Sequence, residues 1–186
     1  MIEYYTLMHK GNCDEYTDNI FMNFGSTVTV LIIYNGENEL PLNEDEKTRV
    51  STYITGCRGI PFQEVSAKLK EYLPEGTAYM LIHINDSLIN IERHGQVYAS
   101  IIKNGEIKLL PNGPFSIEDD DRVVCGTAEF FRYLSQPAIL SDAITAESSE
   151  EWMDNLVCRI SERNQLSEGN LTAVTLIVRK DSDTKI

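Results

Sequence analysis

The sequence predicts one α+β domain with a packed core. Its 42% hydrophobic and 24% charged residues are close to the averages of soluble globular proteins. At 186 residues, the chain can bury roughly two-thirds of the surface that it exposes when unfolded. Stretches of β-branched or alternating apolar residues indicate strands, and between them apolar residues recur at helical spacing. We therefore expect a single domain over residues 1–180 and a polar tail at 181–186.

The first strand is expected at residues 27–34, where β-branched apolar residues dominate. Two helices should follow, at 42–54 and 61–73. Pro61 suits the first turn of a helix, and the apolar residues after it, including Leu69, recur at helical spacing. One face of this helix should therefore pack on a sheet.

The middle of the chain predicts an antiparallel meander. Strands are expected at 78–84, 88–93 and 97–103. The turn-prone residues 85–87 join the first two strands, and the Asn-Gly pair at 104–105 is typical of a hairpin turn after the third. Strands joined by such short turns pair in antiparallel fashion.

The last part of the chain alternates between strands and helices. A strand is expected at 122–125, followed by a helix at about 129–134. A longer helix at about 149–163 carries Trp152 on its apolar face, and a strand at 173–179 ends the domain.

The chain is strongly acidic, with 29 Asp and Glu against 16 Lys and Arg and a net charge of −13. Such a surface repels the phosphates of nucleic acids and anionic lipids, so neither is expected as a partner. No apolar run approaches the roughly 20 residues that a membrane helix needs, and the N-terminus has no signal-peptide pattern. We therefore expect a cytoplasmic protein.

The cysteines do not suggest a metal site or a nucleophile. None has the spacing of metal ligands, so all are expected to be buried, reduced thiols. A tyrosine-phosphatase nucleophile would require an arginine at a fixed short distance after the cysteine, which neither Cys125 nor Cys158 has. The four residues are Cys13, Cys57, Cys125 and Cys158.

Residues 76–110, GTAYMLIHINDSLINIERHGQVYASIIKNGEIKLL, carry a recognisable pattern. A Gly-Thr pair opens a strand, a glycine at 95 precedes another, and an Asn-Gly turn follows it. This pattern resembles the central part of the metal-dependent type 2C protein phosphatases, whose Asp after the central glycine is replaced here by Gln96. Further matches follow the family order: YTDNIF at 16–21, LIIYNGENE at 31–39, EDDDRVVCGTAEFFRYLS at 118–135 and GNLTAVTLIVRK at 169–180.

The resemblance implies a sandwich of two antiparallel β-sheets flanked by helices. It also implies a minimal version of that fold, because only a Pro-Asn-Gly-Pro turn separates Leu110 from Phe115 where the family has a longer segment. A long flap beside the substrate is therefore not expected. In the family, two Mg²⁺ or Mn²⁺ ions held by acidic residues activate the attacking water.

The first two metal-binding motifs of the family are altered in this chain. Under the resemblance, the Glu and Asp of the first motif correspond to Asp18 and Asn19, so only one acid is kept. The aspartate that bridges both metals becomes Asn35, next to a retained Gly36. Between Lys10 and the first motif there is no arginine of the kind with which the family holds phosphate.

The last two motifs are altered as well. The resemblance places Gly126 at the position of a metal-binding aspartate, followed by Thr127. In the terminal motif the aspartate becomes Gly169, while Asn170 and Thr172 are retained. Neighbouring divalent cations repel each other, and several carboxylates are needed to offset this repulsion. Neutral side chains and glycine do not provide them.

We therefore interpret the chain as a pseudophosphatase: an inactive, phosphatase-like regulatory module without a metal cofactor. Its expected partner is a protein, such as a kinase or a phosphoprotein. The alternative is a divergent Mn²⁺- or Mg²⁺-dependent serine/threonine phosphatase with relocated ligands, and a structural subunit unrelated to phosphorylation also stays open. The acids available for relocation include Asp14, Glu15, Asp18 and Glu37, with Glu39, Glu129 and Glu168 beside the altered motifs.

Overall fold

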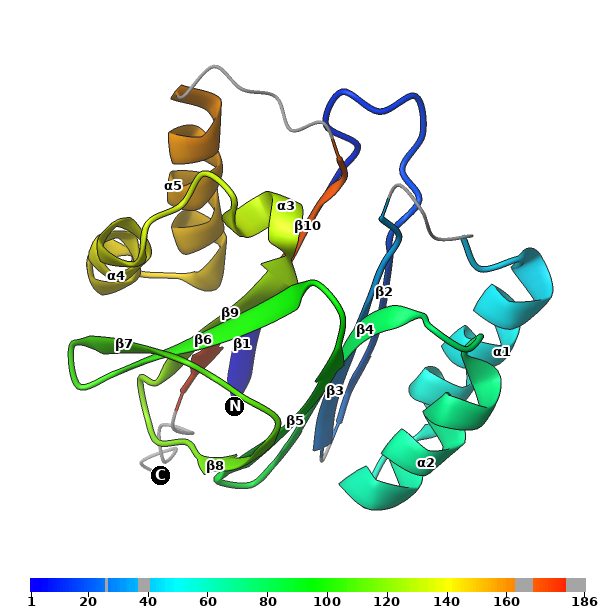
Figure 1. The fold of residues 1–186 in the computed structure, drawn as a ribbon. Helices are drawn as coiled ribbons and strands as arrows, with labels where there is room; N and C mark the ends of the chain where they lie inside the picture. The colour runs from blue at the N-terminus through cyan, green and yellow to red at the C-terminus, as the bar shows by residue number, and fades with distance from the viewer. Residues whose placement is uncertain (26, 37–40, 163–168, 180–186) are drawn as a thin grey trace.

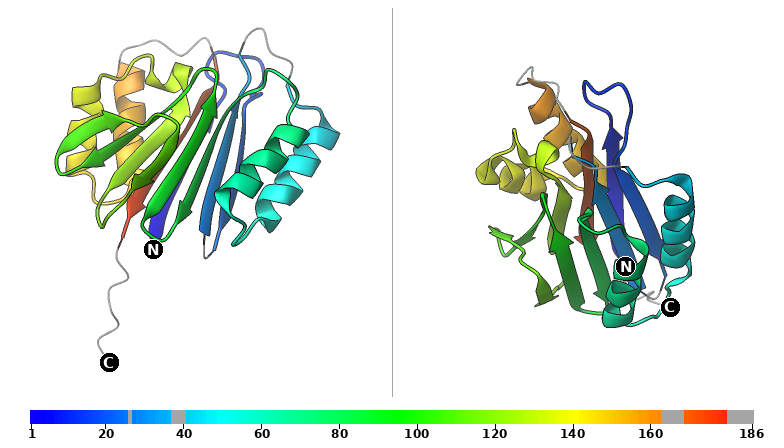
Figure 2. Two further views of the ribbon diagram at one scale, coloured as in Figure 1. Left: turned by 60° about the horizontal axis from the view of Figure 1, so that its bottom comes forward. Right: turned by 45° about the vertical axis from the view of Figure 1, so that its right-hand side comes forward.

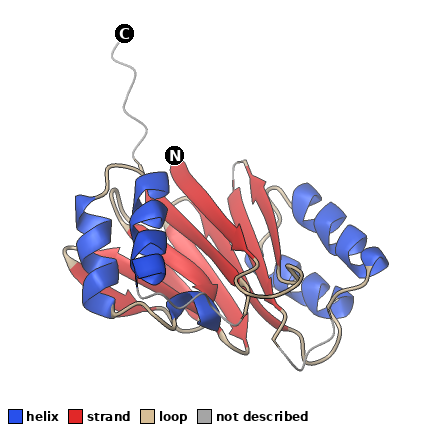
Figure 3. Ribbon diagram, turned by 90° about the horizontal axis from the view of Figure 1, so that it is seen from above, coloured by secondary structure: helices blue, strands red, loops and turns tan. Residues whose placement is uncertain are grey.

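The computed structural model describes residues 1–25, 27–36, 41–162 and 169–179. They form two antiparallel β-sheets packed face to face, with helices on both outer sides (Figure 1). Viewed from above, the strands lie between two groups of helices (Figure 3). The expected α+β sandwich is thus confirmed, whereas the predicted tail at 181–186 lies outside the described residues.

Each sheet has five strands, and all neighbouring strands are antiparallel. The first sheet contains, in spatial order, β1 (Ile2–His9), β10 (Leu171–Val178), β9 (Arg122–Thr127), β6 (Val97–Lys103) and β7 (Glu106–Leu109). The second contains β2 (Asn19–Phe24), β3 (Thr27–Tyr34), β4 (Ala78–Asn85), β5 (Leu88–His94) and β8 (Gly113–Ser116). Only three residues separate β7 from β8, which is consistent with the missing flap.

The helices form the two outer layers (Figures 1 and 2). Helices α1 (Glu44–Gly56) and α2 (Phe62–Tyr72) pack on the second sheet. Helices α3 (Ala128–Phe131), α4 (Gln136–Thr145) and α5 (Ser149–Glu162) pack on the first. In the part of the chain that is described, no helix has the length and apolar character needed to cross a membrane.

An apolar layer between the two sheets forms the centre of the core. Alternate residues of each strand point into this layer, among them Val30 and Ile32 of β3 and Val123 and Cys125 of β9. The residue between the last two, Val124, points outward and packs under the helices. The same alternation decides which residues at the strand ends face the inter-sheet layer and which face the helices.

Local sequence signals fix the ends of several elements. Helix α1 begins after Asn43, whose side chain accepts a hydrogen bond from the Glu46 N–H, while the Glu46 carboxylate accepts one from the Asn43 N–H. The hairpin between β6 and β7 turns at Asn104 and Gly105, both with positive φ of 52° and 75°. Tight hairpin turns of this kind need positive φ at both central residues, which is why an Asn-Gly pair predicts one.

Four elements were not expected from the sequence: β1, β2, β8 and α4. No residue of β1 is fully buried, and its sequence, IEYYTLMH, does not alternate strictly between apolar and polar residues. Helix α4 is held by tertiary contacts, since Arg159 of α5 makes two charge-assisted hydrogen bonds with Asp142, at 2.5 and 2.6 Å. The Arg122 guanidinium of β9 also donates to the carbonyl oxygens of Ala143 and Ala146. In addition, α3 ends at Phe131, earlier than expected.

Two of the four cysteines differ from expectation. Cys57 and Cys125 are buried, and burial raises the pKa of the Cys125 thiol to about 12. Cys158 is exposed and Cys13 is only half-buried, so the prediction that all four are buried is wrong for this pair. None of the four forms a disulfide.

A buried histidine lies beneath the helices that cover the second sheet. His83 is 2% exposed, and its Nδ1 lies 3.1 Å from the Thr29 hydroxyl. The centre of its ring is 6.2 Å from that of Phe62 in α2. Burial lowers the pKa of His83 below its usual value of 6.5, because the apolar surroundings disfavour the imidazolium.

We expect the free energy of unfolding to decrease as pH falls below about 6.5, because the unfolded chain then protonates His83 while the folded protein does not. A His83→Gln variant should lose this part of the pH dependence. Urea unfolding of both proteins near pH 7.5 and near pH 5.5 measures it. His94→Gln, at an exposed histidine, is the control and should behave as the parent does. An equal pH dependence in the parent and in His83→Gln would contradict the prediction.

Candidate functional site

A cleft of about 1010 Å³ opens at one end of the sandwich. It is formed by the loop 10–18, the end of β3, the turn between β5 and β6, helix α3 and the start of β10. The loop after β1 and helix α3 lie at this end, which is uppermost in Figure 1. Residues that line the cleft include Asp14, Glu15, Asn35, Gly36, Glu129, Arg132, Gly169 and Asn170.

The buried side chain of Asn170 holds the loop 10–18 in place. Its Oδ1 accepts hydrogen bonds from the backbone N–H groups of Thr17, at 2.6 Å, and Asp18, at 3.1 Å. Its Nδ2 donates to the carbonyl oxygens of Lys10 and Glu15, at 3.3 and 3.2 Å. One amide thus satisfies backbone groups along the whole loop, which gives this retained residue a structural role.

The carboxylate of Asp18 bridges the two sheets at the base of the cleft. Asp18 is 3% exposed and directly precedes β2 of the second sheet. Its Oδ1 accepts a hydrogen bond from the N–H of Asn35, which follows β3, at 2.8 Å. Its Oδ2 accepts one from the hydroxyl of Thr172 in β10 of the first sheet, at 2.5 Å. Both oxygens are therefore engaged by protein donors.

Tyr16 extends this network. Its hydroxyl lies 2.9 Å from that of Thr172. Because Thr172 has one hydroxyl proton and donates it to Asp18, Tyr16 is the donor to Thr172. Burial raises the pKa of the Tyr16 hydroxyl, and the nearby charge of Asp18 adds to the effect, so the phenol stays protonated at neutral pH.

An ion pair occupies the space next to Gly169. A Cβ atom at this position would lie 2.7 Å from Cγ of Glu129, which is closer than such atoms approach. Glu129 is 7% exposed, and its Oε1 accepts a hydrogen bond from Arg132 at 2.6 Å. The space that a side chain at position 169 would need is thus filled by the Glu129 side chain, which is paired with Arg132.

The register of β9 directs Thr127, and not Gly126, toward the layer between the sheets. Thr127 is fully buried, and its hydroxyl donates to the Asn170 carbonyl oxygen at 3.5 Å. Val123 and Cys125 pack between the sheets, so Thr127, two residues farther on, faces the same side. Gly126 faces the other way, and a Cβ there would lie 2.5 Å from the carbonyl oxygen of Thr172. Position 126, which the resemblance assigned to the family's aspartate in this motif, therefore does not face the layer between the sheets.

The same alternation separates Asp18 from Asn19. Asn19 lies on the outer face of β2 together with Asn23, whose amide donates to the carbonyl oxygens of Ile54 and Thr55 in α1. The Asn19 amide itself donates to the Thr17 carbonyl oxygen at 3.1 Å. Of the two positions predicted for the first motif, only Asp18 faces the inter-sheet layer.

The structure thus gathers most, but not all, of the predicted positions. Asn35, Gly36, Gly169 and Asn170 line one cleft, with Asp18 at its base. Sequence reasoning missed the inward-facing Thr127 and Tyr16. Strand alternation could have identified Thr127, because the apolar residues two and four positions before it are buried.

The described residues do not by themselves supply the acidic ligands of a two-metal centre of the family type. Asp14 and Glu15 line the cleft but are exposed. Within the described ranges, no three Asp, Glu, His or Cys side chains are grouped as metal ligands. The predicted substitutes Glu37, Glu39 and Glu168 lie outside the described residues. Asp18, which is the described carboxylate that faces the inter-sheet layer at the cleft, already accepts two hydrogen bonds from the protein.

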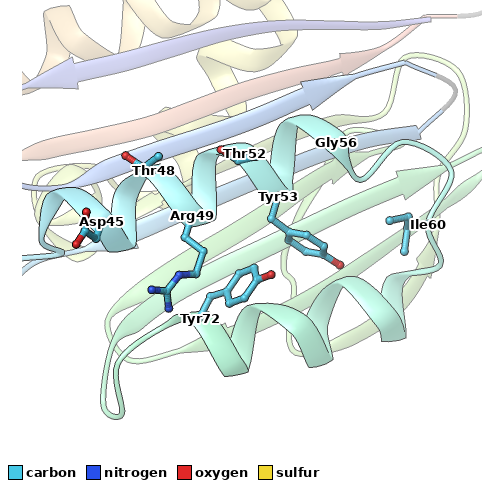
Figure 4. Close-up of a pocket in the computed structure, with 8 residues that line it drawn as sticks. All are labelled: Asp45, Thr48, Arg49, Thr52, Tyr53, Gly56, Ile60 and Tyr72. Atoms are coloured by element: carbon cyan, nitrogen blue, oxygen red, sulfur yellow. The ribbon is translucent and has the colours of Figure 1, made fainter.

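A second cavity, of about 530 Å³, lies between α1 and α2 in the outer layer. Figure 4 shows Tyr53 and Tyr72 facing each other across it, with Arg49 reaching down from α1 beside Tyr72. The two rings meet edge to face at 5.6 Å, and the Arg49 guanidinium carbon is 5.7 Å from the Tyr72 ring centre. Asp45 is the one acid among its lining residues. Paired carboxylates, as hydrolysis with two metals requires, are not found there.

The fold is similar to those of solved phosphatases. The serine/threonine phosphatase of S. agalactiae matches with a TM-score of 0.70 and 15% identity, over 96% of this chain and 100% of that one. RsbX, solved in complex with magnesium, matches with a TM-score of 0.73 and 14% identity, over 95% and 94%. The PP2C phosphatase domain of SpoIIE from Bacillus subtilis, with a fragment of its regulatory domain, gives 0.70 and 11%, over 96% and 63%.

These similarities establish that the chain has the fold of the type 2C phosphatases. No protein-family model and no curated protein sequence matches it. At such low identity, the chemistry of the cleft has to be argued from its own residues.

We expect Asn170→Ala to lower the free energy of unfolding by about 1–3 kcal/mol, because it leaves the buried N–H groups of Thr17 and Asp18 without their acceptor. Urea unfolding measures the change. Asn112→Ala is the matched control: its Oδ1 also accepts a backbone N–H, from Arg93 at 2.9 Å, but at an exposed site. That variant should change stability by about 0.5 kcal/mol or less. Equal effects of the two changes would show that Asn170 does not anchor the loop.

Proposed function

We propose that this chain is a phosphatase-fold protein that binds a protein partner without hydrolysing phosphate. The observation that supports this most directly is the state of Asp18. It is the one described acid that faces the inter-sheet layer at the cleft, and both of its oxygens accept hydrogen bonds from the protein. The other positions at which the family has metal-binding aspartates hold the neutral Asn35, Thr127 and Gly169.

The physical argument concerns charge. Two divalent cations a few ångströms apart repel strongly, and this repulsion is offset only where several carboxylates surround them. An asparagine or threonine oxygen can coordinate a cation but contributes no net charge. Beside Gly169, moreover, the Glu129 carboxylate is already neutralised by Arg132. A water activated between two metals is therefore not part of the proposed function.

The proposed partner is a kinase or a phosphoprotein. The solved neighbours include serine/threonine phosphatases, and a cleft that has lost hydrolysis can still present the surface around it for recognition. The net charge of −13 argues against nucleic acid as the partner. A chain whose four cysteines form no disulfide suits a reducing compartment, so we extend the proposal to a cytoplasmic location.

A second candidate function rests on Asp14 and Glu15. Both line the same cleft, so a divergent phosphatase could hold Mn²⁺ or Mg²⁺ with them. In that case metal binding and turnover should be lost in Asp14→Asn and Glu15→Gln variants. The same measurements therefore decide between the two functions.

We expect no rise in melting temperature when millimolar Mn²⁺ is added to the parent protein, because a ligand stabilises the folded state only when it binds there. Thermal unfolding with and without Mn²⁺ should be run beside hydrolysis of an aryl phosphate and a phosphothreonine peptide. An increase in melting temperature together with metal-dependent turnover, both removed by Asp14→Asn, would overturn the proposal in favour of the divergent phosphatase.

Restoring the acids is a sharper test, since it asks whether the cleft still has the geometry of a metal site. The variant combines Asn35→Asp, Thr127→Asp and Gly169→Asp with Glu129→Ala, which removes the side chain that a residue at 169 would strike. We expect this protein to gain stability from Mn²⁺ where the parent does not. If it does not, the positions assigned to the lost aspartates are wrong.

The matched control places the second aspartate at Gly126 instead of Thr127. A side chain at Gly126 would meet the backbone oxygen of Thr172, so this variant should be less stable by about 1–3 kcal/mol and should not respond to Mn²⁺. Equal metal responses of the two quadruple variants would contradict the register of β9 that the structure gives.

A further inference from the structure

The two sheets have four edge strands, and β1 is the least protected of them. Exposed edges pair readily with other strands unless they are short, charged or interrupted by proline. Strands β7 and β8 have four residues each, with Glu106 and Lys108 in β7 and Pro114 in β8. Strand β2 has six residues. Strand β1 has eight residues, IEYYTLMH, without proline or lysine.

The pairing of β1 with β10 shows which of its backbone groups face outward. Met1 and Arg179 exchange both N–H···O bonds, at 2.7 and 2.9 Å. In an antiparallel ladder such pairs alternate with pairs that do not bond to each other. Residues 2, 4, 6 and 8 therefore direct their N–H and C=O groups away from β10, toward the open edge of the sheet.

The side chains along this edge are apolar and exposed. Among the described residues, six large hydrophobic side chains are exposed, and three of them are Met1, Tyr4 at 43% and Met8 at 55%. The one acid in the strand, Glu3, is paired with Arg179 at 3.2 Å. In a chain with a net charge of −13, this edge is thus a strip where a second copy would meet little repulsion.

We propose that β1 pairs in antiparallel fashion with β1 of a second copy, with Thr6 on the two-fold axis. This register uses only outward-facing backbone groups, because it pairs Thr6 with Thr6 and Tyr4 with Met8. On one face of the joined sheet, Tyr4 of each copy then lies beside Met8 of the other. On the other face, Glu3 of each copy lies opposite His9. The strand is therefore self-complementary, as a two-fold interface requires.

The pairing joins the first sheets of two copies into one continuous sheet. The side chain of Tyr4 is already fixed for such a contact, since its ring stacks on that of Phe24 in β2 with 3.8 Å between the ring centres. A rigid aromatic side chain loses little conformational freedom when it becomes buried in an interface. The interface lies along the strand edge and does not depend on the proposed loss of catalysis.

Light scattering coupled to size exclusion, over a dilution series from millimolar to micromolar, tests the proposal. We expect a mass of twice 21.1 kDa at high concentration that falls toward one chain on dilution. Met8→Lys should shift the protein to the monomer, because a lysine on the edge blocks strand addition. Leu109→Lys is the matched control, at a residue 49% exposed on the opposite edge of the same sheet, and should leave the mass unchanged.

Thr6→Pro should have the same effect as Met8→Lys, because it removes an outward-facing N–H and no bond to β10. Thermal unfolding shows whether each variant is folded. A monomer at every concentration, or a dimer that persists in the folded Met8→Lys and Thr6→Pro variants, would overturn the proposal. A parent that stays monomeric but pairs through this strand with another protein would overturn it as well.

Cross-linking tests the register. In a background with Cys13→Ser and Cys158→Ser, a Thr6→Cys variant should form a covalent dimer on mild oxidation, since paired Cα atoms there lie about 5.5 Å apart. Tyr4→Cys should not, because the two copies of that residue are roughly 13 Å apart along the strands. Cross-linking of Tyr4→Cys but not of Thr6→Cys would exclude the two-fold axis at Thr6.

Discussion

The hydrogen bonds of one buried carboxylate hold the two sheets together at the end where the cleft opens. Asp18 accepts from the backbone next to β3 in the second sheet and from Thr172 in the first. A buried carboxylate loses several kcal/mol of solvation, so it is stable only when its oxygens are satisfied. The loop that carries Asp18 is in turn fixed by Asn170, and together these two side chains give the cleft its shape.

The same network bears on the proposed loss of hydrolysis, because it engages the buried carboxylate at the base of the cleft within the protein. In a two-metal hydrolase the carboxylates are arranged around cations, which offset their mutual repulsion. Here the charges are balanced within the protein, because Asp18 is hydrogen-bonded and Glu129 is paired with Arg132 beside Gly169. The described polar groups at this end of the sandwich are thus held by contacts within the protein.

Much of the fold could be predicted because the core strands have strong local signals. The runs at 27–34 and 97–103 coincide with β3 and β6, and the hairpin at Asn104 and Gly105 follows from the positive φ that such a turn needs. Strand β1 and helix α4 could not be predicted in this way. The first is an edge strand with no fully buried residue, and the second depends on contacts made by Arg122 and Arg159 from distant parts of the chain.

The sequence by itself determined which residue types stand at each position, and only under the resemblance does it predict that most of the family's acids are absent. It did not determine which of two neighbouring residues in a motif faces the layer between the sheets. A shift of one residue in a strand moves a side chain to the opposite face, and the local pattern of polar residues does not specify this register. Only the packing of β9 and β2 between their neighbours decided that Thr127 and Asp18 point inward, while Gly126 and Asn19 point away.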